Sequence, residues 1–374
     1  MPNRLSSFKF FSQCLSTVYG KEDINKLRKE ITQDNIAWED IITLANNMML
    51  TPALWVSLSD KGLTRNLPSD LYEFLKELHD LNSQRNKKLK SQALEAIQTL
   101  NSIDVKPVLL KGSGYLFLNS FGDIGTRMMY DLDIMVPKLA MTSCIKAFHD
   151  LDYHSDPEDD EQFINHHHSA PLIRTGEFGA IELHHELLSQ KASSILPTTD
   201  AWKQIEALPA VATTVYVLSP THRVLHSILH SQIVDGYHKR YIINLRSLHD
   251  LANLIKADGD KIDWVYIQKA MHSHTLKQAL LGQLYQANKL FGIKWPEPMR
   301  ANLSCRFHYL LCVAGIRWKR FARFNRDMRR YSRIDICQRY NCEDKGFQII
   351  KFRLIYTAEL IKRWIKGITR LFKQ

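Results

Sequence analysis

The sequence predicts an α+β fold in which a small mixed-sheet core lies between two helical regions. Three observations support this fold class: the helical spacing of apolar residues over 1–104, the short apolar runs separated by turn residues over 105–196, and the return of helical spacing over 197–303. A basic amphipathic tail over 304–374 follows. Of the 374 residues, 45% are hydrophobic and 24% charged, so the chain is too apolar for a disordered protein and long enough for a sizeable core.

Composition excludes several classes of protein. No stretch approaches the roughly 18 consecutive apolar residues that a membrane-spanning helix needs, and the apolar patch after Lys9 is too broken for a signal peptide. We therefore expect a cytoplasmic protein. The six cysteines form no CxxC pair, which argues against a zinc ribbon or a disulfide scaffold and favours reduced core residues.

The elements follow from the patterns in chain order. Apolar residues recur at three-to-four spacing over 23–50, and Pro68-Ser69 opens a long amphipathic run that ends near residue 100. From Val105 the short apolar runs are PVLLKG, YLFLNSF and DLDIMVP, then a helical KLAMTSCIKAFHDL, then APLIR and AIELHHEL joined by a hairpin-like turn over 175–179. After Pro197, helical segments return, among them PTHRVLHSILHSQIV and YIINLRSLHDLANLIKA.

Two acidic residues on one predicted strand are the first indication of chemistry. Asp131 and Asp133 lie two apart in DLDIMV, so their carboxylates project from one face of the strand. Carboxylates at this separation suit Mg²⁺ and would repel each other without a cation. Glu182, in the later run IELHHEL, offers a third acidic group on a strand, and His184 lies on the same face.

A glycine-containing turn lies upstream of this strand. The run PVLL leads into Lys111-Gly112-Ser113-Gly114 and then into a helical segment. A strand that turns through glycine into a helix N-terminus presents free backbone N–H groups to a phosphate. The turn and the carboxylates are therefore complementary: one suits phosphate and the other suits the cation that accompanies it.

These motifs carry a resemblance to a known family. The glycine-serine turn, the DxD strand and the later acidic strand resemble the nucleotidyltransferase fold of the DNA polymerase β superfamily. More narrowly, VLLKGSGYLF, GTRMMYDLDIMV and IELHHEL resemble the bacterial uncharacterised nucleotidyltransferase family over about residues 105–190. Two features differ from the superfamily pattern: the gap from Gly112 to Asp131 is longer than usual, and the third acidic residue is Glu rather than Asp.

The resemblance implies a function and a role for each matching residue. Asp131 and Asp133 would hold two Mg²⁺ ions, with Mn²⁺ as an alternative, that bridge the phosphates of an NTP, and Glu182 would complete the metal site. Gly112 and Ser113 would bind the terminal phosphates. The implied reaction is the Mg²⁺-dependent transfer of an NMP from an NTP to an acceptor hydroxyl or phosphate, with release of pyrophosphate.

Two cations are added from the residues themselves. Lys111 and Arg127 lie beside these motifs and are assigned to nucleotide binding, because a cation near the phosphates offsets the charge of the transferring group. For Arg127 the alternative is a structural one, in which it pairs with a carboxylate and anchors its loop.

The histidines raise the alternative of a zinc site. His166-His167-His168 and His184-His185 are adjacent pairs or triplets, and His222, His226 and His230 follow at i, i+4, i+8 on one helical face. No HExxH pattern accompanies them. The same helical face suits a cleft lining, and we assign His184 and His230 to that role.

The positive charge is concentrated at the C-terminus. Residues 317–374 carry 17 Lys/Arg and 5 Asp/Glu, a balance of +12 against +11 for the whole chain. An apolar helical stripe faces away from much of this charge and comprises Ile350, Leu354, Ile361, Ile365, Ile368 and Phe372. The alternatives are a stripe that packs on the body, contact of 317–374 with RNA or another acidic substrate, and docking on an anionic membrane, which would place the protein at the inner membrane surface.

The acceptor is left open by the sequence. A sugar phosphate, a peptide, a protein side chain or an RNA 3′ end each presents a nucleophile to the same metals. Two further alternatives compete with the leading function: a toxin-type enzyme that modifies tRNA or protein, and a catalytically inactive docking module that keeps the nucleotidyltransferase-like fold.

Overall fold

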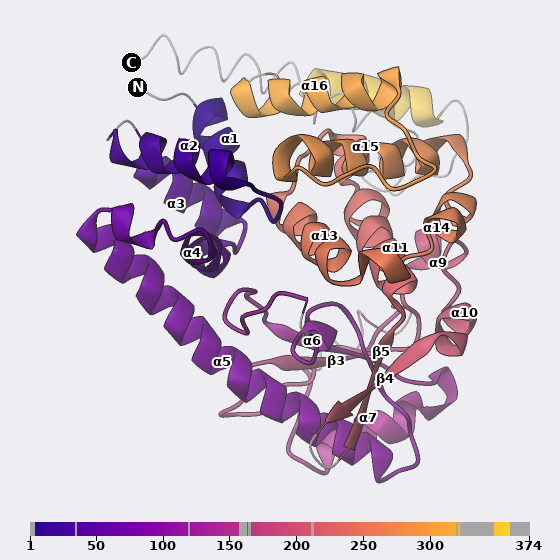
Figure 1. Cartoon of the computed structure of the whole chain (residues 1–374). Coiled ribbons are helices and arrows are strands. Elements are labelled where there is room, and N and C mark those ends of the chain that lie inside the picture. The colour runs from indigo at the N-terminus through magenta and orange to yellow at the C-terminus, as the bar shows by residue number, and fades with distance from the viewer. Residues whose placement is uncertain are drawn as a thin grey trace. The chain divides into compact units, whose positions relative to one another are not determined.

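The computed structural model describes residues 4–33, 36–118, 120–156, 163, 166–210, 213–318, 321 and 348–359 (Figure 1). The chain divides into two compact units, one of residues 1–239 and 243–309 and the other of residues 240–242 and 310–374. The predicted fold class is confirmed: helices precede and follow one five-stranded mixed sheet.

The N-terminal helices pack around one another and then lead into the sheet. α1 contacts α3, α4 and the later helix α15, and α4 contacts α5, whose 33 residues extend from these helices to the sheet. The bounds are α1 Arg4–Leu15, α2 Lys21–Thr32, α3 Trp38–Asn47, α4 Thr51–Asp60, η1 Thr64–Asn66, α5 Ser69–Asn101 and α15 His274–Phe291.

The sheet has the strand order β3-β2-β1-β5-β4. β2 is parallel to β3 and antiparallel to β1, while β5 is parallel to β1 and antiparallel to β4. β1 therefore joins the two halves of the sheet. The strands are β1 Val108–Leu109, β2 Asp131–Met135, β3 Ala180–His184, β4 Ile205–Ala210 and β5 Thr213–Leu218.

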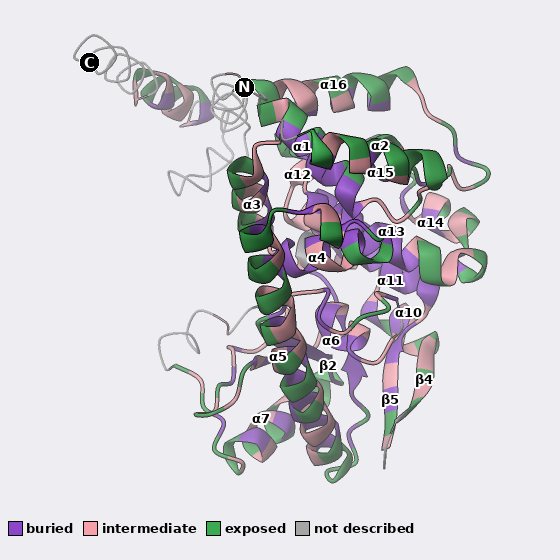
Figure 2. Ribbon diagram, turned by 60° about the vertical axis from the view of Figure 1, so that its left-hand side comes forward, coloured by how far each residue is buried: buried purple, intermediate pink, exposed green. Residues whose placement is uncertain are grey.

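The two faces of the sheet have different surroundings. Leu132 and Ile134 of β2 are fully buried in a cluster with Leu89 and Ala93 of α5 and Phe148 of α7 (Met141–His149). Figure 2 shows α5 with an exposed outer side and a buried inner side along its length. Because side chains alternate along a strand, Asp131 and Asp133 project from the opposite face, which is free of this apolar layer.

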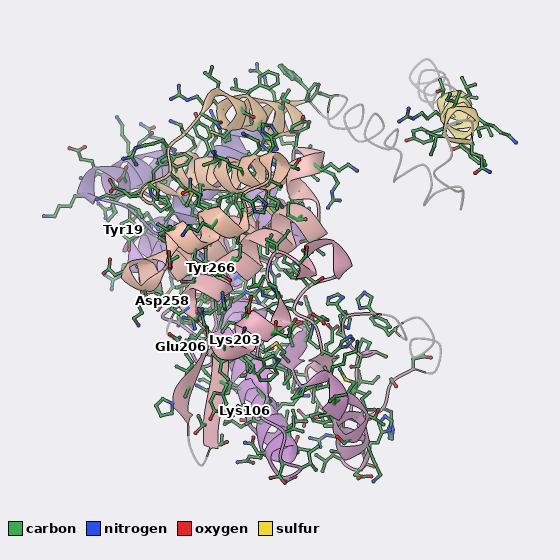
Figure 3. All side chains as sticks on the ribbon, turned by 90° about the vertical axis from the view of Figure 1, so that its right-hand side faces the viewer. Tyr19, Lys106, Lys203, Glu206, Asp258 and Tyr266 are labelled. Carbon is green, nitrogen blue, oxygen red and sulfur yellow. The ribbon has the colours of Figure 1, made fainter. Side chains whose placement is uncertain are left out.

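The helices after residue 197 form the other wall beside the sheet. α11 (Pro220–Leu229) continues into a short π-helix, η3 (His230–Val234), and packs against α13 (Leu245–Asp258). Arg223 of α11 joins neighbouring elements, because its guanidinium lies 3.3 Å from Glu206 of β4 and 2.9 Å from Asp258 of α13. Figure 3 labels both carboxylates on the same side of the structure.

Shorter elements complete the chain. They are α6 Lys111–Tyr115, η2 Lys138–Ala140, α9 Gln190–Ser193, α10 Thr198–Lys203, α12 Tyr237–Arg240, η4 Gly259–Lys261 and α14 Trp264–Ala270, and the C-terminal helix α16 covers Leu303–Arg317. Residues 348–359 are also helical.

The structure shows where the expected elements begin and end. The helical segment expected after PVLL is α6, which begins directly after β1. The sheet also extends past residue 196, where we had ended the α/β core, since the β4–β5 hairpin pairs with β1. The expected turn over 175–179 is present, and Leu172 and Ile181 exchange backbone hydrogen bonds of 2.8–2.9 Å across it.

The cysteine prediction agrees with the described residues. Cys14, Cys144, Cys305 and Cys312 are buried free thiols, whereas Cys337 and Cys342 lie outside the described part of the chain. Among the described helices, no single one is long and apolar enough to cross a membrane; α3 and α4 pass that test only as a pair bent by 119°.

Most of the predicted basic tail lies outside the described residues. Residues 322–347 and 360–374 are among these, including Ile361, Ile365, Ile368 and Phe372 of the apolar stripe. In the described helix over 348–359, Ile349 and Tyr356 are buried, while Ile350 and Leu354 are exposed. The role of the tail therefore stays a prediction.

Candidate active site

Three carboxylates gather on one face of the sheet. β2 and β3 are parallel and in register, so Asp133 pairs with Glu182 and Met135 pairs with His184. Alternation along each strand then directs Asp131 and Asp133 of β2, and Glu182 and His184 of β3, to the same side. Asp133 is 2% exposed, whereas Asp131 and Glu182 are half-buried.

Asp133 is held by three neighbours. The Lys111 Nζ lies 2.7 Å from the Asp133 Oδ1, and the His184 Nε2 lies 2.8 Å from the same oxygen. Because a carboxylate only accepts, His184 donates its Nε2–H here. The backbone N–H of Asp133 donates to the Ser113 hydroxyl at 2.7 Å. These contacts fix both the backbone and the side chain of Asp133.

The pKa values of two neighbouring carboxyls, Asp133 and Glu182, shift in opposite directions. Burial disfavours the charge of Asp133, but Lys111 and His184 outweigh it and hold the pKa of this carboxyl well below its usual range. Burial, together with the nearby Asp133 and Asp131, raises the pKa of Glu182 to about 7. Lys111 thus neutralises one carboxylate, and the site holds more negative charge than its own cation compensates.

The residues present fit a divalent metal. Carboxylate oxygens of Asp133 and Glu182 lie within 4.8 Å of each other, and Asp131 is two residues from Asp133 on the same face. Carboxylate oxygens are the ligands that Mg²⁺ and Mn²⁺ prefer. The pKa of Glu182 is raised in part by the negative charges of Asp133 and Asp131, and a cation bound here would compensate those charges.

The turn between β1 and α6 brings Lys111 to this site. Lys111 has a φ of 43°, in the left-handed region that non-glycine residues rarely adopt. Gly112 follows, and a Cβ there would lie 2.5 Å from the Arg127 Nη1 and 2.6 Å from the Met129 Sδ. A side chain at residue 112 would therefore displace the Arg127 and Met129 side chains, and the left-handed backbone at Lys111 accompanies the contact of its amine with Asp133.

Ser113 and α6 differ in detail from a long phosphate-binding helix. α6 has only five residues, and the Ser113 side chain is fully buried with its hydroxyl bound to Asp133. The structure therefore shows Ser113 as a support for β2. The role of Gly112 and Ser113 in phosphate binding stays a prediction.

Arg127 makes the structural contact that we had weighed as its alternative. Its guanidinium forms a paired contact with Asp250 of α13, with distances of 3.1–3.2 Å, and this ion pair is largely buried. The pair ties the loop before β2 to α13. Arg246, one helical turn before Asp250, strengthens this connection by donating to the Met128 carbonyl at 2.7 Å.

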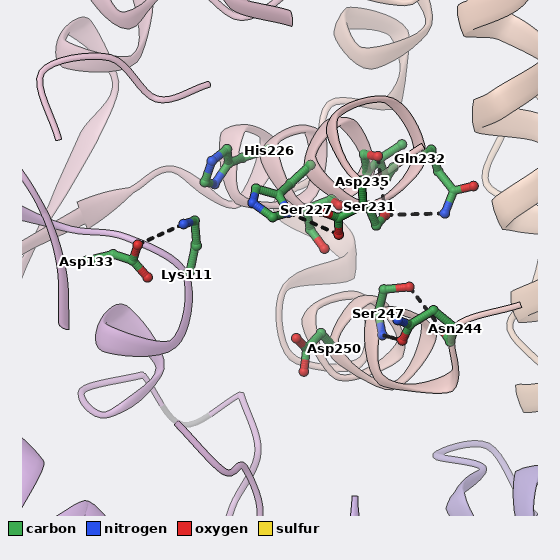
Figure 4. Close-up of polar contacts among 12 residues, drawn as sticks. Lys111, Asp133, His226, Ser227, Ser231, Gln232, Asp235, Asn244, Ser247 and Asp250 are labelled. Carbon is green, nitrogen blue, oxygen red and sulfur yellow. Dashed lines mark hydrogen bonds and ion pairs between the residues drawn. The ribbon is translucent and has the colours of Figure 1, made fainter. Parts of the chain in front are cut away.

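A cavity of about 370 Å³ opens beside Lys111, between β1 and β5 on one side and α11 and α13 on the other. Its cationic lining residues are Lys111, Arg127, Arg223 and Arg246. Figure 4 shows the Lys111–Asp133 pair at one side and Ser227, Ser231, Asn244 and Ser247 at the other. A phosphorylated or hydroxyl-rich ligand of small size suits such a lining.

The predicted cleft histidines occupy different places. His184 is fully buried among the carboxylates, while His230 lines the cavity with its Nδ1 3.5 Å from the Asp235 Oδ2. His222 contacts the Tyr266 hydroxyl, and His226 contacts the Leu187 carbonyl. Among the described residues, the three helical histidines therefore form no common metal site.

Sequence reasoning missed the contribution of α13. Asp250 and Arg246 lie at i and i−4, so they share one helical face, and both line the cavity. A charged pair at this spacing is common on solvated helices, so neither residue was assigned a role, although the segment LRSLHDL that contains both resembles the same nucleotidyltransferase family more loosely. His166–His168 were noticed only as a zinc alternative, although His168 lies 3.9 Å from Glu182.

One family of known proteins matches most of the chain. Residues 34–292 match the family model described as "Uncharacterised nucleotidyltransferase". A search of curated proteins and a search of solved structures each found no significant match. Because the matched region covers more than half of the chain, the protein belongs to this nucleotidyltransferase family, whose members are transferases of phosphorus-containing groups.

Proposed function

We propose that this member of the uncharacterised nucleotidyltransferase family moves an NMP from an NTP to an acceptor hydroxyl or phosphate, with Mg²⁺ or Mn²⁺ bound by Asp131, Asp133 and Glu182. The observation that carries this proposal is the presence of three carboxylates on one face of two paired strands, beside a cation-lined cavity. Bound divalent ions supply charge neutralisation at the phosphates and lower the pKa of the attacking hydroxyl.

Residues of the chain position the metal-binding carboxylate and offset the charge of the phosphates. Asp133 is preorganised by Lys111, His184 and Ser113, so its carboxylate needs little rearrangement before it binds a cation. The Lys111 amine also lines the cavity, where it offsets phosphate charge. The tight turn at Gly112 keeps the Arg127 guanidinium close to this position.

The reaction has a defined balance of atoms. The acceptor oxygen forms a bond to the α-phosphorus, and the bond from that phosphorus to the bridging oxygen breaks. Pyrophosphate leaves with the electron pair of the broken bond, and where the acceptor is a hydroxyl its proton passes to solvent water. We place the NTP in the cavity beside Lys111, because its cationic lining complements a polyphosphate.

The experiment is a search for carboxylate-dependent nucleotide addition. The full chain, made with and without Asp131→Asn/Asp133→Asn, is incubated with each NTP, Mg²⁺ and cell extract, and mass spectrometry screens small molecules, peptides and RNA for the added mass of a nucleotide. Asp200→Asn is the matched control, because Asp200 pairs with Lys203 on the surface. We expect nucleotide addition by the native protein and by this control, and none by the double variant.

Two results would redirect the assignment. Nucleotide addition to RNA or protein alone favours the toxin-type alternative. No carboxylate-dependent addition to any acceptor favours the docking module, in which the fold has lost turnover.

The basic tail has a separate proposed role. We assign 317–374 to an accessory contact with RNA, because its Lys and Arg residues alternate with Trp318, Phe321, Phe324 and Tyr331. The contact should weaken steeply as salt rises. An anionic membrane is the competing partner, and replacing Trp364, Ile365 and Ile368 with polar residues distinguishes the two because only vesicle binding depends on the apolar stripe.

A further inference from the structure

Three consecutive histidines form a compact cluster that the proposed transfer does not use. One imidazole nitrogen from each of His166, His167 and His168 lies within 4.8 Å of the others. Their ring centroids are 4.2–4.6 Å apart. His166 is exposed, while His167 and His168 are half-buried, so the cluster is open to ions from solvent.

Backbone contacts hold this segment against the end of β3. The Ser169 N–H donates to the Leu183 carbonyl at 2.8 Å, and the His167 carbonyl accepts from the His185 and Glu186 N–H groups at 3.1 and 3.2 Å. The His166 N–H donates to the Phe163 carbonyl at 2.9 Å. The backbone bends at His166 and His167, so the three successive side chains lie together, whereas an extended strand would alternate them.

Neighbouring groups prepare individual imidazoles for binding. The His168 Nδ1 lies 2.8 Å from the Ser169 carbonyl, so Nδ1–H donates and Nε2 keeps its lone pair. Such an outer contact fixes the ring and its tautomer in metal sites. The Phe163 ring lies 4.9 Å from the His166 ring and 5.0 Å from the His168 ring, and it provides an apolar wall beside the cluster.

We propose that His166, His167 and His168 bind one divalent ion of the Zn²⁺, Co²⁺ and Ni²⁺ class, at a site separate from the Mg²⁺ carboxylates. Imidazole nitrogen suits these ions, whereas Mg²⁺ prefers oxygen. Zinc–nitrogen bonds of about 2.0–2.1 Å place tetrahedral ligands about 3.3 Å apart, so the imidazoles close by about 1.5 Å at most. The half-exposed rings can make this movement by rotation of their side chains.

The inference goes beyond the proposed function and does not depend on it. The ion would lie near the carboxylates, because His168 lies 3.9 Å from Glu182 of β3. Three protein nitrogens leave the fourth position of a tetrahedral ion open to water. The class of ligand follows from the donor atoms alone.

The test is a metal titration of the full chain without a polyhistidine tag. The chelator-treated protein is titrated with Co²⁺, whose visible absorption reports a low-symmetry nitrogen environment, and calorimetry gives the stoichiometry. With the carboxylate site kept filled by excess Mg²⁺, we expect one equivalent of Co²⁺ per chain, which Zn²⁺ displaces and Mg²⁺ does not. His166→Asn, at the exposed position, should weaken Co²⁺ binding at least tenfold, and the triple Asn variant should abolish this equivalent.

Matched variants separate this site from other histidines and from the carboxylates. His149→Asn/His154→Asn removes another neighbouring pair, whose rings are 6.0 Å apart, and should leave the titration unchanged. Asp131→Asn should also leave it unchanged. Far-UV circular dichroism of the metal-free variants checks the fold; if the triple variant misfolds, His166→Asn alone decides. The proposal is overturned if His166→Asn binds Co²⁺ as tightly as the native chain, if Mg²⁺ displaces the bound Co²⁺, or if the native chain binds no equivalent of Co²⁺ tightly.

Discussion

Lys111→Met tests the electrostatic account of the site. The Lys111 amine lies 2.7 Å from the Asp133 Oδ1, and the Asp133 side chain is 2% exposed. Removing the amine leaves a buried carboxylate with the His184 Nε2–H as its close partner. Loss of one partner from a buried ion pair costs about 3–5 kcal/mol. Because the Lys111 side chain is 25% exposed, water compensates in part, and we expect a loss of about 3 kcal/mol in the free energy of unfolding.

The assay is denaturant unfolding at pH 7, first with chelator and then with Mg²⁺. The two compact units need not unfold together, so the loss is measured on the transition that Asp133→Asn also shifts. Mg²⁺ should narrow the gap between Lys111→Met and the native chain, because the variant lacks the Lys111 charge and binds the cation more tightly, and at one Mg²⁺ concentration the chain with the lower Kd gains more stability.

The control is Lys203→Met, which removes an exposed lysine paired with Asp200. This change should shift the same transition by no more than about 0.5 kcal/mol, as is usual for surface substitutions. The reasoning is refuted if Lys111→Met is as mild as the control, or if Mg²⁺ leaves the gap between variant and native chain unchanged.

Three further predictions concern the turn, a buried lysine and the tail. Gly112→Ala should cost about 1–3 kcal/mol by displacing the Arg127 and Met129 side chains, whereas Gly259→Ala, where the added Cβ meets nothing within 4 Å, should be neutral or stabilising in thermal unfolding. Burial lowers the pKa of Lys61 from 10.5 to about 8, so the Lys61 amine binds its proton more tightly in the unfolded chain than in the folded chain. The free energy of unfolding of the native chain, relative to that of Lys61→Met, should therefore rise between pH 8 and 10.5. A decrease in this difference over that range contradicts the prediction. Truncation after Gly315 should preserve Mg²⁺-dependent nucleotide addition but weaken RNA binding, and an insoluble product would mean that the tail is structural.

Strand β2 and its acidic face were predictable because they depend on local spacing, whereas β4 and β5 were not predicted. Asp131 and Asp133 alternate with Leu132 and Ile134, and this period of two determines which side chains face the apolar layer. The structure places both aspartates on β2 and Glu182 on the paired strand β3. The chemical role assigned to them stays a prediction that the experiments above address.

Other features depend on contacts between distant parts of the chain. The pairing of β5 with β1 joins residues more than 100 positions apart, and no local sequence pattern predicts it. The Arg127–Asp250 pair is likewise a long-range contact between a loop and α13. For Lys111, the left-handed backbone and the ion pair to Asp133 appear only when the turn is folded against β2.

The most direct test of nucleotidyl transfer follows the two ends of the NTP. Once an acceptor is known, the reaction is run with NTP labelled at the α-phosphate and, separately, at the γ-phosphate, beside Asp131→Asn/Asp133→Asn and the Asp200→Asn control. The account predicts that the α-label moves to the acceptor, that the γ-label appears in pyrophosphate, and that both need the two aspartates. Transfer of the γ-label to the acceptor, or α-label transfer that persists in the double variant, would contradict it.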